Sequence, residues 1–199
     1  MKDLVVEAPR AAGRPRSTRA HDAIIDAVLD LLAEGTPLAD MSIEQIAAKA
    51  GVGKATIYRR WASKDALVMD AVTCLKLPLP ALAGESVRDD LITLLNTTGR
   101  ERDPRAGAVM PLLMTHLRRN PELHSWYQRT IEPRRERMRE VLRRGVASGE
   151  LRADLDVEVT TAVLSAPMIL QRMLNWNPHL DTETLPARIV DAVLAGASG

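Results

Sequence analysis

Apolar residues recur along the chain every three or four positions, which is the spacing of one face of an α-helix. Ile24, Ala27, Val28 and Leu31 form the first such stripe, and Gly35 follows it as a helix end. No segment has the alternating pattern of a β-strand, and no glycine-rich phosphate loop occurs. The pattern therefore predicts an all-α protein.

The segment 42–64 carries the densest set of local signals. Ser42 with Gln45 three residues later forms a capping box, which predicts a helix start. The apolar face of this helix ends at Gly51, where a left-handed residue costs little only for glycine. A second short helix follows, with Ile57 pointing inward. The segment is therefore expected to be a helix-turn-helix.

The charge of this hairpin favours DNA as its partner. It carries five basic residues and no acidic residue after Glu44, the basic ones being Lys49, Lys54, Arg59, Arg60 and Lys64. The alternative is an ordinary hairpin with a solvated face, but such faces usually mix both signs of charge. A basic helical hairpin is suited to placing a helix in a DNA groove.

Three blocks of the chain resemble the TetR/AcrR family of bacterial transcription regulators: residues 24–35, 41–67 and 149–158. Many members have Tyr-x-His-Phe where this chain has Tyr58-Arg59-Arg60-Trp61. Trp61 can fill the aromatic core position, and Arg60 adds charge near the DNA backbone. The resemblance implies an N-terminal three-helix helix-turn-helix DNA-binding domain, followed by a C-terminal helical bundle for ligand binding and dimerisation.

Geometry and the resemblance together give a set of expected DNA contacts: Arg14, Arg16, Ser42, Lys54, Ala55, Thr56, Tyr58, Arg59, Arg60 and Lys64. Arg14 and Arg16 belong to a basic arm that could reach the minor groove, or be a terminus with incidental arginines. Ser42 could be a helix cap, a phosphate contact, or both.

The part of the chain after Ser86 is expected to form further helices, over about 86–100, 103–118, 120–148, 157–176 and 184–195. Pro111, Pro133 and Pro167 fall inside these patterns, and internal prolines bend helices and can leave a cavity between them. Interleaved Glu132, Glu136 and arginines predict a solvated, salt-bridged face rather than a second nucleic-acid site.

An apolar pocket in this half is the main hypothesis for a ligand site, and the resemblance also implies an inducer pocket there. Its expected lining is Met110, Met114, His116, Trp126, Tyr127, Met168 and Gln171. Methionine adapts to varied ligand shapes. The alternative for any one of these residues is ordinary core packing.

The 199 residues are expected to divide into a basic arm at 1–16, a DNA-binding domain at 17–62 and a ligand-binding and dimerisation domain at 63–199, with 63–77 as a connecting helix. The expected partners are double-stranded operator DNA, a small apolar effector and a second copy of the chain, bound through the last two helices. No metal, no cofactor and no membrane partner is expected.

The net charge of +1 and the single cysteine, Cys74, change this prediction little. A lone cysteine fits a reducing compartment, and no apolar run reaches membrane-spanning length, so a cytoplasmic protein is expected. A helical enzyme is the second class considered, but the histidines show no metal-binding spacing, so we expect no enzyme. A DNA-binding architectural protein without a ligand is the third.

Overall fold

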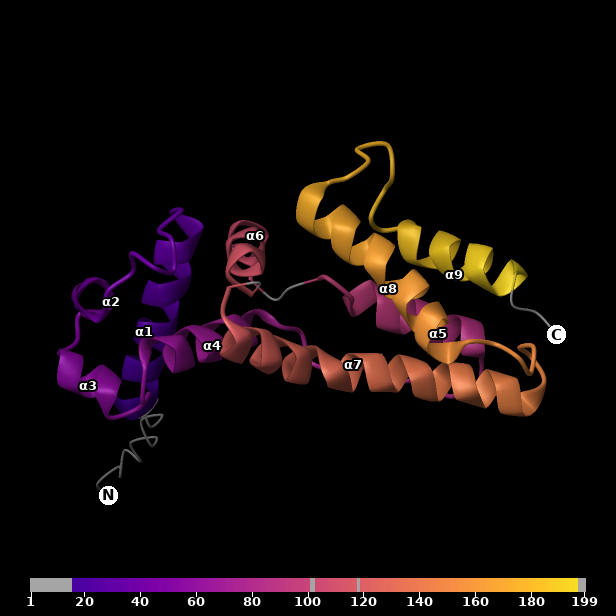
Figure 1. Ribbon diagram of the computed structural model, residues 1–199, viewed down its shortest axis with the longest axis horizontal. Coiled ribbons are helices and arrows are strands. Elements are labelled where there is room, and N and C mark those ends of the chain that lie inside the picture. Colours follow the sequence, from indigo (N-terminus) through magenta and orange to yellow (C-terminus); the bar gives the residue numbers. More distant parts are fainter. Residues whose placement is uncertain (1–15, 101–102, 118, 197–199) are drawn as a thin grey trace, which may run out of the picture.

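A computed structural model describes residues 16–100, 103–117 and 119–196, and these fold into nine α-helices with no β-strand among them. Figure 1 labels the helices in chain order. They are α1 (Arg16–Ala33), α2 (Ile43–Ala50), α3 (Lys54–Tyr58), α4 (Lys64–Leu75), α5 (Val87–Thr97), α6 (Ala106–Leu117), α7 (Pro121–Ser148), α8 (Val157–Leu174) and α9 (Leu185–Ala195). The all-α prediction is confirmed.

The helix ends follow the local chemistry of the sequence. Ser42 and Gln45 form the predicted capping box, and Gly51 ends α2 with a φ of 66°. Ser63 accepts the backbone N–H of Ala66 at the start of α4. Each cap satisfies backbone groups that the first or last turn of a helix leaves without a partner.

The start of α6 differs from the prediction. The Asp103-Pro104 pair was expected to begin the helix, but α6 begins at Ala106. The Oδ1 atom of Asp103 instead accepts the backbone N–H of Arg105 at 2.9 Å, which makes a local turn ahead of the helix. The Arg105 side chain is thereby placed beside α1.

Buried side chains gather in two hydrophobic clusters. The first cluster joins α1–α4 to α6 and the start of α7, and includes Ile24, Ile57 and Leu113. The second joins α5, the later part of α7, α8 and α9, and includes Leu91, Leu142 and Leu164. The first cluster therefore runs across residues 62 and 63, and the division of the chain there stays a prediction.

The two clusters lie at opposite ends of an elongated molecule, and α7 runs from its middle to the end that holds the second cluster (Figure 1). Helices α2 and α3 form one tip, α8 and α9 lie toward the other, and α6 stands between them. Pro111, Pro133 and Pro167 lie inside α6, α7 and α8, as the sequence predicts. The space between the two clusters is where a cavity occurs.

Candidate functional site

The helical hairpin α2–α3 is held by an apolar inner side. Ile43, Ile46 and Ile57 are buried against α1 and α4. Trp61 follows α3 and is also buried, so the predicted aromatic core position is filled. Its ring stacks on His21 with centroids 5.3 Å apart, and its Nε1 atom donates to Asp70 of α4 at 2.9 Å. The hairpin is therefore fixed to both neighbouring helices.

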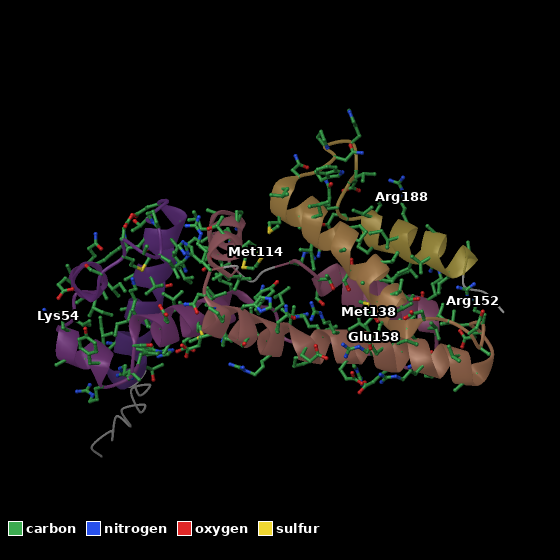
Figure 2. The ribbon with its side chains drawn as sticks, viewed as in Figure 1. Lys54, Met114, Met138, Arg152, Glu158 and Arg188 are labelled. Carbon is green, nitrogen blue, oxygen red and sulfur yellow. The ribbon has the colours of Figure 1, made fainter. Side chains whose placement is uncertain are left out.

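The outer side of α3 carries polar and basic groups. Lys54, Ala55, Tyr58 and Arg59 are exposed, and the side chain of Tyr58 keeps 58% of its surface open to solvent. Figure 2 shows Lys54 at one tip of the molecule. An exposed tyrosine beside arginine and lysine matches the surface that a helix presents to a DNA groove.

Thr56 and Arg60, the two other predicted contacts near α3, are half-buried. The Lys54 ammonium also has a carboxylate neighbour, since it donates to Oε1 of Glu44 at 2.8 Å. That hydrogen bond lowers the pKa of Glu44 and raises the pKa of Lys54. Exposed pairs of this kind contribute little to stability, so a phosphate can displace Glu44 from Lys54 at small cost.

Ser42 and Lys64 have structural contacts that bear on their predicted role. The hydroxyl of Ser42 accepts the backbone N–H of Gln45 at 3.2 Å. The Lys64 ammonium donates to the carbonyls of Leu38 and Met41 at 2.7 and 2.9 Å, which fixes the loop before α2. Arg14 lies outside the described residues, and Arg16 is the first residue of α1.

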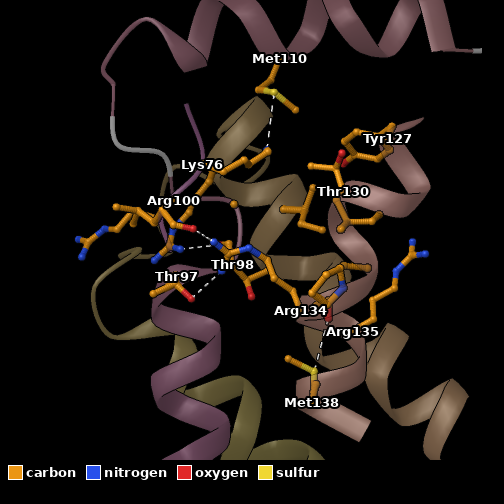
Figure 3. Close-up of a pocket in the computed structure, with 18 of the residues that line it drawn as sticks. Lys76, Thr97, Thr98, Arg100, Met110, Tyr127, Thr130, Arg134, Arg135 and Met138 are labelled. Carbon is orange, nitrogen blue, oxygen red and sulfur yellow. Dashed lines mark hydrogen bonds between the residues drawn. The ribbon is translucent and has the colours of Figure 1, made fainter. Parts of the chain in front are cut away.

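A cavity of about 700 Å³ lies between the two hydrophobic clusters. Its walls come from the end of α4 and the segment after it, the end of α5, and helices α6, α7 and α8. Figure 3 shows Thr97, Thr98 and Arg100 on one side of this cavity and Tyr127 and Thr130 on the other. Its volume lies in the range of small-molecule sites.

Two of the seven predicted pocket residues, Met110 and Tyr127, line this cavity. Five lie elsewhere: Met114, His116, Trp126, Met168 and Gln171. Met114 and Trp126 pack against the first hydrophobic cluster, Met168 is fully buried in the second, and His116 borders a smaller cavity beside Lys64.

Gln171 is buried, does not line the cavity and hydrogen-bonds the segment that follows α8. Its Nε2 atom donates to the carbonyl of Asn177 at 2.9 Å, and its Oε1 atom accepts the backbone N–H of the same residue at 2.9 Å. Both ends of the amide are therefore used to fold the chain back after α8. A polar residue on an apolar helix face is here a structural group.

The sequence alone did not predict that basic residues line the cavity. Six of them line it: Lys76, Arg100, Arg134, Arg135, Arg139 and Arg172. Within the arginine-rich part of α7, the expected salt bridges do form, since Arg139 contacts Glu132 and Glu136 at 2.8 and 2.6 Å. On the same helix, the Arg134 guanidinium donates hydrogen bonds to the carbonyl of Leu77 and to Thr97 Oγ1. One side of α7 therefore faces the cavity.

Arg105 joins the cavity region to the DNA-binding helices. Its guanidinium donates to Asp26 at 2.9 Å and to Asp30 at 2.6 Å, both on α1, and it also contacts Asp103. Asp103 lines the cavity. The three carboxylates, with hydrogen bonding to Asp103 as the largest cause, raise the pKa of Arg105 above its ordinary range, so the group stays charged.

The part of the chain that the structure describes has neither a metal-ligand cluster nor a membrane-spanning helix. No group of three or more histidine, cysteine, aspartate or glutamate side chains there is placed to hold a metal ion. None of the described helices is long and apolar enough to cross a bilayer.

Comparisons with known proteins agree with this geometry. Residues 24–71 match the family model described as bacterial regulatory proteins, tetR family, and residues 83–193 match the tetracyclin repressor-like C-terminal domain. The uncharacterized HTH-type transcriptional regulator YdeS of Bacillus subtilis (strain 168) is 34% identical over 174 residues, which cover 85% of this chain and 86% of YdeS.

Solved structures show the same fold. A TetR-family transcriptional regulator from Rhodococcus sp. superposes with a TM-score of 0.69 at 18% identity, covering 88% of this chain and 98% of that one. A transcriptional regulator from Saccharomonospora viridis, solved in complex with choline, gives a TM-score of 0.68 at 18% identity, covering 92% and 99%. With a helix-turn-helix surface, a cavity beyond it and these matches along its length, the chain belongs to the tetR family of bacterial transcription regulators.

Proposed function

We propose that the protein is a cytoplasmic, homodimeric repressor that binds a palindromic operator through α3 and leaves it when a small molecule fills the cavity. The exposed basic side of α3, held rigidly by Trp61 and α4, is the observation that carries this proposal. Membership of a family of DNA-binding regulators supports the DNA partner. The choline complex of a structural relative supports a small-molecule partner.

The operator contacts can be tested at the outer side of α3. Tyr58→Ala and Arg59→Ala are expected to weaken operator binding about tenfold or more while the fold is retained, because each removes an exposed group that can touch DNA. If Arg59 contacts a phosphate, its removal should also lower the slope of log affinity against log salt by about one. Fluorescence anisotropy with labelled operator at several salt concentrations measures both quantities.

Arg152→Ala is the matched control for this experiment. Arg152 is exposed and lies at the end of the molecule far from α3, as Figure 2 shows. The Arg152→Ala substitution removes one positive charge, as Arg59→Ala does, so it controls for the effect of net charge on DNA binding. If Arg59→Ala, Arg152→Ala and the parent protein bind operator with equal affinity, Arg59 does not contact the DNA.

Dimerisation is proposed through α8 and α9. Large apolar side chains of α8 and the residues just after it stay exposed in the single chain and do not line the cavity: Val159, Val163, Leu174 and Trp176. Four such residues along one segment exceed the scattered apolar groups of an ordinary monomer surface. A second copy related by a twofold axis would cover this face, and would place two α3 helices about 34–36 Å apart or somewhat more on DNA.

We propose that Arg105 transmits a change in the cavity to α1. A ligand that displaces Asp103 would move Arg105, and Arg105 holds Asp26 and Asp30 of the DNA-binding helices. The path is short and made of charged hydrogen bonds, which resist stretching more than apolar contacts do. Binding of ligand and of DNA would then affect each other equally.

Arg105→Met tests this contact. The variant is expected to lower the free energy of unfolding by about 1–2 kcal/mol, because three carboxylates lose a partner that is only partly exposed. Hydrogen exchange of the α1 amides should become faster. Arg88→Met is the control, since Arg88 pairs with Asp191 at an open surface and should cost less. Equal costs for the two variants would argue against a special role for Arg105.

A further inference from the structure

The lining of the cavity carries an excess of positive charge. Six basic side chains face two acidic ones, Asp103 and Glu158. Both acidic groups already have an arginine: Asp103 contacts Arg105, and Glu158 lies 2.8 Å from Arg139. The lining residues therefore carry more positive than negative charge, although Arg100 and Arg139 also pair with Glu183, Glu132 and Glu136 next to the cavity. An excess of positive charge favours an anionic guest over a neutral or cationic one.

Arg172 is the most informative of these residues. It lies on α8 and its Nη1 atom donates to the carbonyls of Leu95 and Asn96 at 3.3 and 3.1 Å, and to that of Thr98, at the end of α5. Its Nε and Nη2 atoms make no hydrogen bond among the described residues, and no carboxylate of those residues forms an ion pair with it. Part of the guanidinium is therefore still able to bind an acceptor.

The surroundings of Arg172 make its charge costly. The side chain is half-buried, and this burial lowers the pKa of the guanidinium, with a second contribution from the positive charge of Arg100. The acidic residue that raises it is Glu183, which is already bound to Arg100 at 2.7 Å. An added anion would give the Arg172 guanidinium an ion-pair partner, which no carboxylate of the described residues provides.

Another part of the cavity wall is apolar, although threonines and Ser165 also line the cavity. Met110 belongs to the first hydrophobic cluster and Met138 to the second, and both line the cavity together with Ile131, Ile169 and Met173. Methionine side chains adapt to an aliphatic chain or a ring at little cost. A ligand body in this region would touch both hydrophobic clusters at once.

We propose that the effector is a carboxylate with an apolar body, its carboxylate bound by Arg172 beside Arg100 and its body lying along Met110 and Met138. This inference rests on the proposed ligand-binding function and names its chemical class. A planar guanidinium binds a carboxylate through two parallel hydrogen bonds. A neutral ligand of the same shape would cover Arg172 without giving it a partner, which is unfavourable. A cation would meet like charge.

The test compares three probes with the same ten-carbon chain: decanoate, decanol and decyltrimethylammonium. Each is titrated into the 199-residue protein in a calorimeter, the two charged probes below their micelle concentrations and decanol below its solubility limit. Decanoate is expected to bind at least about tenfold more tightly than the other two. Arg172→Met is expected to remove this preference, weakening decanoate about tenfold or more and leaving decanol within about threefold. Arg172→Lys retains the positive charge but loses the two parallel donors of the guanidinium. Its preference for decanoate should lie between those of the parent protein and Arg172→Met.

Two controls keep the result decisive. Arg152→Met removes a positive charge that lies outside the cavity lining, toward the end of the molecule, and should leave all three affinities unchanged. If Arg172→Met does not fold, Arg100→Met at the same end of the cavity takes its place, with a smaller but equally selective loss expected.

Equal binding of decanoate and decanol, tighter binding of the cationic probe, or an equal effect of Arg172→Met on all probes would overturn the inference. So would the failure of every probe to bind. Operator binding of the same preparations is measured separately. If the protein binds operator but prefers decanol, the regulator function stands and the carboxylate inference fails. If it prefers decanoate but selects no DNA, the regulator function fails instead.

Discussion

Replacing Trp61 with alanine is expected to lower the free energy of unfolding by about 3–5 kcal/mol, the usual cost of deleting a large buried aromatic side chain. Trp61 is 7% exposed, stacks on His21 of α1 and donates a hydrogen bond to Asp70 of α4. Its loss leaves a cavity where three helices meet and leaves Asp70 without this donor. Urea unfolding followed by circular dichroism measures the change.

The same substitution is expected to abolish operator binding at temperatures where α2 and α3 loosen. Trp61→Phe is the matched control, since it keeps an aromatic ring and loses the Nε1 hydrogen bond, at a cost of about 1–3 kcal/mol for the hydrogen bond and the smaller ring. Operator affinity should then stay near that of the parent protein. A loss of less than about 1 kcal/mol in Trp61→Ala would show that the hairpin is not held through this residue.

Val163→Asp is expected to convert the protein to a monomer and to weaken operator binding more than about a hundredfold, because binding of the second half-site depends on the link to the first. Val163 is 49% exposed on the apolar face of α8, and an aspartate there would be buried without a partner in the proposed interface. Size-exclusion chromatography with light scattering gives the mass, and an operator titration gives the affinity.

Ala153→Asp is the control for this substitution. Ala153 is exposed in the turn between α7 and α8, so the variant adds the same charge away from the proposed interface. It should stay dimeric and bind operator normally. A Val163→Asp protein that remains dimeric would show that the exposed face of α8 is not the dimer interface.

Local chemistry explains why the helices could be predicted from the sequence. The capping box at Ser42, the left-handed Gly51 and the cap at Ser63 act within a few residues of one another. Such signals do not depend on what packs nearby. The start of α6 was misplaced because Asp103 could cap a helix or bind Arg105, and only the position of α1 decides between them.

The cavity lining was less predictable because it depends on which helix faces meet. Met168 and Met173 lie on the same helix, yet Met168 is buried in the second cluster while Met173 lines the cavity. One available signal was overlooked. Asp26 and Asp30 are four residues apart on α1, where like charges destabilise a helix unless a cation lies near them. That pair indicated a basic partner, which the structure identifies as Arg105.

Selection of bound sequences from a pool of random DNA, using the full-length protein, tests the central claim most directly. The account predicts one enriched sequence with twofold symmetry, its half-site centres about one helical turn or somewhat more apart, as two α3 helices on one face of DNA require. Enrichment of no sequence, or of a single half-site without symmetry, would contradict a dimeric operator-binding regulator.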